Sequence, residues 1–394
     1  MPFRWPSMLK DTLSGLMFLL AAATLMVLAL HHGAVAPRPA PSRPSAPVRG
    51  GRRAFREQLW HQCRNVLLMS QLQFPWEVDG RRRRCRKTHR SVEEMLEGLR
   101  KLQKSQPGER AANVVFIGDS RVYGLQSTLM KKLNMRPANF SNVPLFYSGI
   151  FYSKEELRRA IPSSEKLSDL RSGCTEAKIY APPGAGGRAR CSLAGETATL
   201  RGTSWWRPFL QRRFGERLDA LLAECEVGRC ADLVVLSSGP WYVTAERYPG
   251  EGVTRRVVRF IADLAAQRAR IARLAAATKV VWKDNEPFMP EIAYGRKWHI
   301  TRSLMVLSAV VHEAASRVPR LSVWTSGVAE VTQFYHSVCV THRSNFSAVT
   351  GPVRGECRDP MHVGKTLSWR MLQTLFNVLL FDVNTPSQGL CCGS

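Results

Sequence analysis

Short, mostly apolar runs alternate along the chain with longer segments in which apolar residues recur every three or four positions. The short runs have the length and composition of buried strands, and they lie at 113–118, 232–239, 279–283 and 320–324. The longer segments have helical spacing, and they lie at 91–104, 121–133, 253–277, 300–316 and 363–381. Between the first two strands, residues 140–230 are expected to form a long irregular middle.

Unbroken apolar strands that alternate with helices are typical of a parallel sheet covered by helices on both faces. The pattern therefore predicts an α/β fold, a three-layer α/β/α sandwich with a central parallel sheet. In such sheets, ligands bind beyond the carboxyl ends of the strands. Three stretches follow the predicted strands and should converge at one edge: Gly118-Asp119-Ser120, Ser238-Gly239-Pro240-Trp241 and Asp284-Asn285.

The N-terminal part of the chain has a different composition. Residues 13–30 contain no charge, and a helix of this length, at about 1.5 Å per residue, just spans a bilayer. A cleaved signal peptide is the alternative, but Pro37 directly follows the cleavage-like Ala34-Val35-Ala36 and should impede cleavage. We therefore predict a cytoplasmic tail at 1–12, a transmembrane signal anchor at 13–30, a Pro- and Arg-rich stalk at 31–53 and a catalytic domain at 54–394, although the Arg residues of the stalk run against the positive-inside rule.

The cysteines and glycosylation signals favour the secretory pathway. The chain has 10 Cys, an even number without zinc-site spacing, so we expect disulfides and no metal site. Two sequons begin at Asn139 and Asn345 and are expected to carry glycans. Together with the apolar segment, they predict a Golgi membrane protein with its catalytic domain in the lumen.

The basic composition bears on the partners. The formal net charge of +26 predicts attraction to acidic partners such as sialylated or sulfated sugars, nucleotides or anionic lipid. A solvated, Arg-biased surface explains the same count, because the Arg residues are spread along the chain. We expect a glycan acceptor, sialylated as one option, a membrane contact through the anchor, and no nucleic acid.

The candidate chemistry lies in two short motifs. Ser120 follows the first strand in GDSR, where the start of a helix favours a developing oxyanion. Asp359 and His362 form the only close Asp/His pair, just before the last helix. A serine nucleophile needs a base and an orienting carboxylate, and these three residues supply that set. The alternatives are a helix cap at Ser120 and ordinary loop residues at the other two positions.

The order of these motifs resembles the GDSL/SGNH hydrolase superfamily. Within it, the chain is most similar to the PC-esterase group, and there to the lumenal catalytic domain of sialate O-acetyltransferase. The resemblance covers roughly residues 60–390 and is carried by FIGDSR (116–121), TSWWRP (203–208), VVLSSGPW (234–241), VVWKDNEP (280–287), the D-x-x-H motif and QGLCCGS (388–394).

The resemblance implies roles for individual residues. Ser120 would be the nucleophile, with Asp359 and His362 as its partners and the Ser120 backbone N–H in the oxyanion hole. The superfamily often supplies an Asn from its third block, which this chain lacks there, so we assign the second donor to the Ser238–Gly239 stretch. Arg121 matches the family pattern and is expected to hold an anionic substrate group.

The aromatic residues near the predicted edge complete the expected site. Trp241 is expected to contact a sugar ring, with Trp205 and Trp206 either beside it or packed in the core. We thus predict a Golgi-lumenal serine O-acetyltransferase for carbohydrate hydroxyls, with sialic acid as a candidate acceptor and acetyl-CoA as a candidate donor, and with no bound cofactor.

Two alternatives of the same fold stay open: a carbohydrate O-acetylesterase, and a catalytically inactive PC-esterase-like binding protein. A glycosyltransferase is disfavoured because no Asp-x-Asp pair is present. A sulfotransferase is disfavoured because no phosphate-cradling loop follows a strand.

Overall fold

The computed structural model describes part of the compact unit Ala54–Ser394. The described residues are 77–78, 81–82, 91–137, 145–147, 150–152, 174–179, 189–244, 251–287, 298–340, 357 and 362–380. The predicted tail, anchor and stalk lie outside them. Among the described helices, none is both long enough and apolar enough to cross a membrane.

A ten-stranded sheet forms the centre of the described residues, in the order β12-β11-β10-β3-β9-β8-β7-β5-β6, with β4 paired to β8. Five neighbouring strands are parallel: β12 (Leu321–Trp324), β11 (Val280–Lys283), β10 (Leu233–Leu236), β3 (Ala112–Gly118) and β9 (Leu200–Trp206). The remaining strands are β8 (Ala189–Glu196), β7 (Cys174–Ile179), β5 (Leu145–Tyr147), β6 (Ile150–Tyr152) and β4 (Arg136–Pro137). A separate two-stranded sheet joins β1 (Glu77–Val78) to β2 (Arg81–Arg82).

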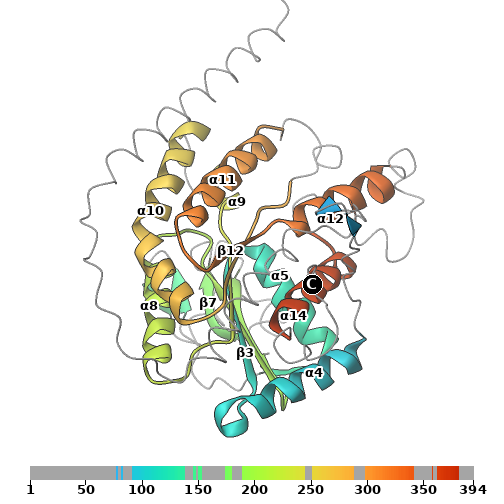
Figure 1. Cartoon of the computed structure of the whole chain (residues 1–394). Helices are drawn as coiled ribbons and strands as arrows, with labels where there is room; N and C mark the ends of the chain where they lie inside the picture. Colours follow the sequence, from blue (N-terminus) through green and yellow to red (C-terminus); the bar gives the residue numbers. More distant parts are fainter. Residues whose placement is uncertain are drawn as a thin grey trace, which may run out of the picture. The chain divides into compact units, whose positions relative to one another are not determined.

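Helices cover both faces of the sheet (Figure 1). The first face packs against α4 (Val92–Ser105), α5 (Ser120–Lys132), α12 (Ser326–Phe334), the π-helix η2 (Tyr335–Val340) and α14 (Lys365–Leu379). The second face packs against α8 (Arg212–Glu226), the short α9 (Pro240–Val243), α10 (Val253–Ala277) and α11 (Trp298–Ser316). A 3-10 turn, η1 (Pro107–Glu109), links α4 to β3.

The alternation of side chains along β3 shows why both faces must be covered. Val114 and Phe116 belong to the core under α5 and α14, whereas Val115 and Ile117 belong to the core under α8 and α10. Successive residues of a strand point to opposite faces, so an unbroken apolar strand needs an apolar partner on each side. The predicted three-layer α/β/α fold is therefore confirmed.

The predicted elements are largely confirmed. α10 has the bounds that the helical spacing predicts, and each of the four predicted strands lies within one residue of the predicted range or inside it. The prediction of an irregular middle at 140–230 is wrong, because β7, β8, β9 and α8 lie there.

The second half of the sheet departs from the predicted parallel arrangement. β8 pairs antiparallel with both β9 and β7. A short turn between Glu196 and Leu200 permits this, and the Thr197 hydroxyl accepts the Leu200 N–H at 3.0 Å within it. An antiparallel pair can be joined by such a turn, whereas a parallel pair needs a long crossover.

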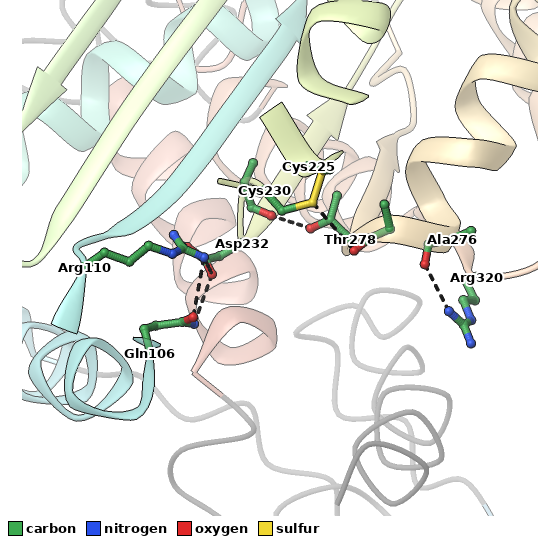
Figure 2. Close-up of a disulfide and its surroundings, with 10 residues drawn as sticks. Gln106, Arg110, Cys225, Cys230, Asp232, Ala276, Thr278 and Arg320 are labelled. Carbon is green, nitrogen blue, oxygen red and sulfur yellow. Dashed lines mark hydrogen bonds and ion pairs between the residues drawn. A yellow bond between two sulfur atoms is a disulfide. The ribbon is translucent and has the colours of Figure 1, made fainter. Parts of the chain in front are cut away.

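Two disulfides are formed among the described cysteines, as the sequence predicted. Cys225–Cys230 closes the end of α8 just before β10, and Cys339–Cys357 joins η2 to a residue that precedes α14 in the chain. Figure 2 shows the first of these beside the amino end of β10. There, Asp232 accepts hydrogen bonds from the Asn113 N–H at 2.7 Å and from Arg110 at 2.8 and 2.9 Å. These contacts fix β3 and β10 side by side.

Candidate active site

The carboxyl ends of the parallel strands bring the predicted stretches to one edge. In the register, Ile117 of β3 pairs with Leu236 of β10, and Leu236 pairs with Trp282 of β11. The residues after these strands therefore start at neighbouring points, as the strand–helix alternation predicted.

Ser120 is the first residue of α5 and does not cap it. Asp119 is the N-cap, and its buried carboxylate accepts the Arg121 N–H at 2.9 Å. The alternative interpretation of Ser120 as the helix cap is therefore wrong, because the preceding residue takes that role. The Ser120 hydroxyl is half-buried and available for another partner.

Gly118 allows the chain to turn at this point. A Cβ at this position would lie 2.3 Å from the Ser237 carbonyl oxygen and 2.9 Å from a methyl group of Val122. The backbone of β10 cannot yield to a side chain at such a distance, so only glycine lets β3 end against it. The glycine of the GDSR motif is thus required by the close approach of two strand ends.

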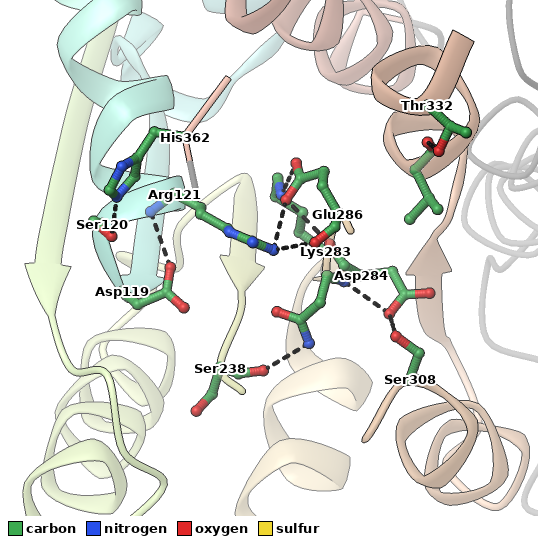
Figure 3. A network of polar contacts seen from close by, with 12 residues as sticks. Asp119, Ser120, Arg121, Ser238, Lys283, Asp284, Glu286, Ser308, Thr332 and His362 are labelled. Carbon is green, nitrogen blue, oxygen red and sulfur yellow. Dashed lines mark hydrogen bonds and ion pairs between the residues drawn. The ribbon is translucent and has the colours of Figure 1, made fainter. Parts of the chain in front are cut away.

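The partner of the Ser120 hydroxyl is His362. The His362 Nε2 lies 2.6 Å from the Ser120 Oγ, although the two residues are 242 positions apart (Figure 3). His362 is half-buried and precedes α14, which packs on α5. If the imidazole carries its proton on Nδ1, Nε2 accepts the hydroxyl proton, as a general base requires. Asp359 lies outside the described residues, so its orienting role stays a prediction.

Arg121 points away from the Ser120–His362 pair, toward the end of β11. Its guanidinium donates to the Glu286 main-chain oxygen at 2.7 Å and lies 3.3 Å from the Glu286 Oε2. Lys283 donates to the other carboxylate oxygen of Glu286. These side chains are only 2–4% exposed, so the structure gives Arg121 an internal carboxylate partner. Its contact with an anionic substrate group stays a prediction.

The ionisation of Glu286 is set by these neighbours. Burial acts to raise the pKa of the Glu286 carboxyl, but the charges of Lys283 and then Arg121, together with hydrogen bonds, hold that pKa below its usual value. Glu286 is therefore an ionised acceptor at neutral pH. Figure 3 shows its carboxylate between the two cations.

Ser238 and Gly239 lie at the same edge, after β10. The Ser238 hydroxyl donates to the Pro208 carbonyl oxygen at 2.8 Å, so this side chain is already committed. Gly239 adopts a φ of 145°, a conformation that favours glycine, and a Cβ there would lie 2.6 Å from the Asn285 Nδ2. The predicted oxyanion role of this stretch would thus fall to its backbone, and it stays a prediction.

Asn285 is a site residue to which the sequence analysis gave no role. Its Nδ2 donates to the Ser238 carbonyl oxygen at 3.1 Å, so an Asn amide lies beside the third sequence block although it comes from the next strand. The signal was present in the sequence, since Asp284-Asn285 follows the third predicted strand. What the sequence did not give was the direction of the side chain.

Asp284, the first residue after β11, is held by contacts on the side of α11. Its Oδ1 accepts the Asn285 N–H at 2.8 Å and the Ser308 hydroxyl at 2.5 Å, and its Oδ2 lies 3.2 Å from the His312 Nε2. The hydrogen bond to Asp284 raises the pKa of the His312 imidazole, partial burial opposes this, and the Asp284 charge adds to the increase.

Aromatic rings line the edge next to Ser120. The ring of Trp206 lies 6.4 Å from that of Tyr123 and 5.8 Å from that of Trp241, both edge to face. Trp206 is buried, whereas Tyr123 and Trp241 are partly exposed. Trp205 faces the core under α8, with Arg217 stacked 3.5 Å from its ring centre. The sugar contact of Trp241 stays a prediction, and Tyr123, one helical turn after Ser120, was missed by the sequence analysis.

Asn139 and Asn345 are outside the described residues. Within the described part of the chain, no group of three or more His, Cys, Asp or Glu side chains is placed to hold a metal ion.

Comparisons with known proteins give likenesses at the level of structure. No protein-family profile and no curated protein matches the chain. It is similar to a catalytic mutant of an acetylxylan esterase from Geobacillus stearothermophilus, with 12% identity, 71% of this chain and 99% of that chain covered, and a TM-score of 0.32. It is also similar to a peptidoglycan O-acetylesterase, with 11% identity, 74% and 95% covered, and a TM-score of 0.35.

Proposed function

We propose that this chain is a serine enzyme that transfers acetyl groups to or from carbohydrate hydroxyls. The observation that carries the proposal is the 2.6 Å contact between the Ser120 Oγ and the His362 Nε2. Two polar residues from distant parts of the chain meet at a strand end, in the relation of nucleophile and base. The sequence blocks that resemble sialate O-acetyltransferase support the choice of an acetyl group and a sugar.

The proposed reaction has two steps. In the first, the Ser120 Oγ attacks the carbonyl carbon of the acetyl donor, its proton moves to the His362 Nε2, and the leaving group departs with that proton. In the second, a sugar hydroxyl gives its proton to the His362 Nε2 and attacks the acetyl-Ser120 carbonyl. The intermediate then collapses to the new ester, and His362 returns the proton to the departing Ser120 Oγ. If water takes the place of the sugar, the same steps hydrolyse the ester.

The negative charge of each tetrahedral intermediate needs hydrogen-bond donors. The Ser120 backbone N–H, in the first turn of α5, lies at the positive end of the helix dipole. A further donor is proposed at the backbone of Gly239, since the Ser238 hydroxyl is bound to the Pro208 carbonyl oxygen. Removing one such donor commonly costs about 100- to 1000-fold in kcat.

The acceptor is proposed to bind along the partly exposed rings of Tyr123 and Trp241, which pack against the buried Trp206. The two partly exposed rings flank the buried one and reach from α5 to α9. Apolar ring faces suit the C–H face of a pyranose. Acetyl-CoA remains the candidate donor and sialic acid the candidate acceptor.

The proposed location is the Golgi membrane, with the catalytic unit in the lumen. The uncharged segment 13–30 and the two sequons support it, and disulfides such as Cys225–Cys230 persist in oxidising compartments. The full chain should colocalise with Golgi markers, and peptide-N-glycosidase should increase its gel mobility. The double variant Asn139→Gln/Asn345→Gln should lose that change, whereas a chain that never changes mobility would contradict the location.

The activity is tested on the full chain, purified in detergent from the secretory pathway of cultured cells. A fluorophosphonate probe should label the wild type and the control Ser316→Ala, whose exposed hydroxyl on α11 donates to the Glu313 carbonyl oxygen. It should not label Ser120→Ala. Equal labelling of Ser120→Ala and wild type would overturn the nucleophile, and a wild type that never reacts would favour the inactive binding protein.

Substrate arms separate transfer from hydrolysis. Acetyl-CoA with a sialylated glycoprotein should yield acetylated sugar if the enzyme is a transferase. An O-acetylated glycan without another acceptor should release acetate if it is an esterase. If both arms fail while the probe still reacts at Ser120, the proposed glycan substrates are excluded, but the proposal that Ser120 is a nucleophile is not.

A further inference from the structure

The end of β11 carries four consecutive polar residues that are all buried. Lys283, Asp284, Asn285 and Glu286 expose between 1% and 6% of their surface. Burying polar side chains is costly unless each finds a partner. Each of the four has one: Lys283 and Glu286 contact each other, Glu286 also contacts Arg121 of α5, Asp284 contacts Ser308 of α11, and Asn285 contacts Ser238 just after β10. Such a set at the edge of the candidate active site calls for a functional explanation.

Building on the proposed serine chemistry, we propose that Lys283 and Glu286 are positioning residues for Ser120, and that they act through Arg121. Lys283 binds one carboxylate oxygen of Glu286, and Arg121 lies against the other. Arg121 directly follows Ser120 in the first turn of α5. The chain of contacts therefore runs from β11 to the residue beside the nucleophile.

Arg121 contacts both the backbone and the side chain of Glu286. Its Nη1 donates to the main-chain oxygen at 2.7 Å and lies 3.3 Å from the Oε2. A guanidinium held by two oxygens of one residue has little freedom to rotate, because its donors are fixed in one plane. This anchors the first turn of α5 to Glu286, three residues after the end of β11.

Ser120 itself is half-buried, but both of its neighbours are buried and bonded. On one side, Asp119 caps α5 through the Arg121 N–H at 2.9 Å. On the other side, Arg121 is held by Glu286. The local cap fixes the helix start, and the long-range contact fixes it relative to the sheet. His362 reaches Ser120 from a different element, so the 2.6 Å contact depends on this placement.

Lys283 determines which way the Glu286 carboxylate faces. Without the ammonium, the Oε1 of Glu286 loses its only described side-chain donor, and a buried acceptor without a donor tends to reorient. Arg121 would then lose or lengthen its contact with the Oε2 while keeping the one with the Glu286 main-chain oxygen, and the first turn of α5 would shift because it is held less firmly. A displacement of about 1 Å at a reacting group can lower a rate by about 100-fold.

The test compares Lys283→Met, which keeps the length of the side chain and removes its donor, with Lys283→Arg, which keeps a cation. The full chain is assayed with 4-nitrophenyl acetate and with the fluorophosphonate probe, at a temperature where circular dichroism shows every variant folded. Lys283→Met should lower kcat and the labelling rate about tenfold or more and leave KM within about twofold. Lys283→Arg should recover most of the loss.

Lys101→Met is the matched control. Lys101 is an exposed residue of α4, so the same substitution there should leave kcat and the labelling rate unchanged. If Lys283→Met does not fold, Glu286→Asp carries the same expectation, because it keeps the charge and withdraws the carboxylate by one methylene.

The outcomes separate this inference from the proposed function. A folded Lys283→Met or Glu286→Asp that keeps the wild-type kcat and labelling rate overturns the positioning role. The proposed serine chemistry survives that result, provided the wild type is labelled at Ser120. A loss that Lys283→Arg does not recover, or a loss that falls on KM alone, also overturns it. A wild type that reacts with neither reagent overturns the serine chemistry, and the positioning role falls with it.

Discussion

Glu286→Gln should destabilise the protein substantially. The substitution keeps the shape of the side chain and removes the charge that Arg121 and Lys283 share, at a site where these side chains are 2–4% exposed. Removing one partner of a buried ion pair typically costs about 3–5 kcal/mol, because the remaining charge stays buried. For the unit Ala54–Ser394, about 340 residues, an unfolding entropy of about 0.7 kcal/mol/K converts this to a Tm lower by about 4–7 °C.

Glu313→Gln is the matched control. Glu313 pairs with Arg317 on the surface of α11, where the two side chains are 36% and 39% exposed. Exposed pairs of this kind contribute about 0.2–1 kcal/mol, so the Tm should fall by about 1 °C or less. Both variants are measured by scanning calorimetry of the full chain at one scan rate.

The pH dependence adds a signature that belongs to Glu286. Its pKa is lowered in the folded protein, so its contribution to stability is present above the unfolded pKa, about 4.3, and is lost as the pH falls through the lower folded value. The Tm difference between wild type and Glu286→Gln should therefore be widest near neutral pH and should shrink in acid. A Glu286→Gln variant with the same Tm as Glu313→Gln at neutral pH would refute the reasoning.

Three further predictions concern the surroundings of the site. Gly118→Ala places a Cβ 2.3 Å from the Ser237 carbonyl oxygen and should cost about 1–3 kcal/mol or more, measured as a lower Tm. His312→Gln should lower the Tm in mild acid and change it little at alkaline pH. A raised His312 pKa in the folded protein stabilises it below the unfolded pKa of about 6.5, and that stability is lost as the pH rises through the folded pKa. An equal effect on the Tm at both pH values would contradict the Asp284 contact. Trp241→Ala should raise KM for a glycan substrate about tenfold and leave the turnover of 4-nitrophenyl acetate unchanged, whereas equal losses on both substrates would argue against a sugar contact.

The strands and the position of Ser120 could be predicted because they depend on local pattern. The four residues before Gly118, 114–117, are all apolar because β3 is covered on both faces, and that leaves a clear signal. The carboxyl ends of parallel strands must lie together, so the meeting of the GDSR and KDNEP stretches followed from topology. His362 could be predicted as the base because it lies in a close Asp/His pair before the last predicted helix, and the structure brings it to Ser120.

The direction of individual side chains could not be predicted in this way. Arg121 was expected to face a substrate, but its guanidinium turns to Glu286, 165 positions away. Asn285 reaches across to the β10 end, and no local signal distinguishes that from an outward direction. These choices depend on tertiary packing.

The middle of the chain was missed for a different reason. β9 mixes small and polar residues with its tryptophans, so it lacks the unbroken apolar run that marks β3. α8 does carry a signal, since Phe214, Leu218 and Leu221 repeat at helical spacing and are buried. A closer comparison of spacing in this segment would have found the helix.

The central claim is that Ser120 becomes acetylated during turnover. The most direct measurement quenches the full chain soon after mixing with an activated acetyl ester and locates the adduct by mass spectrometry of its peptides. The account predicts one acetyl group on Ser120 that builds up in wild type, is absent in Ser120→Ala, and accumulates far more slowly in His362→Ala. An adduct that sits on another residue, or that forms equally in Ser120→Ala, would contradict it.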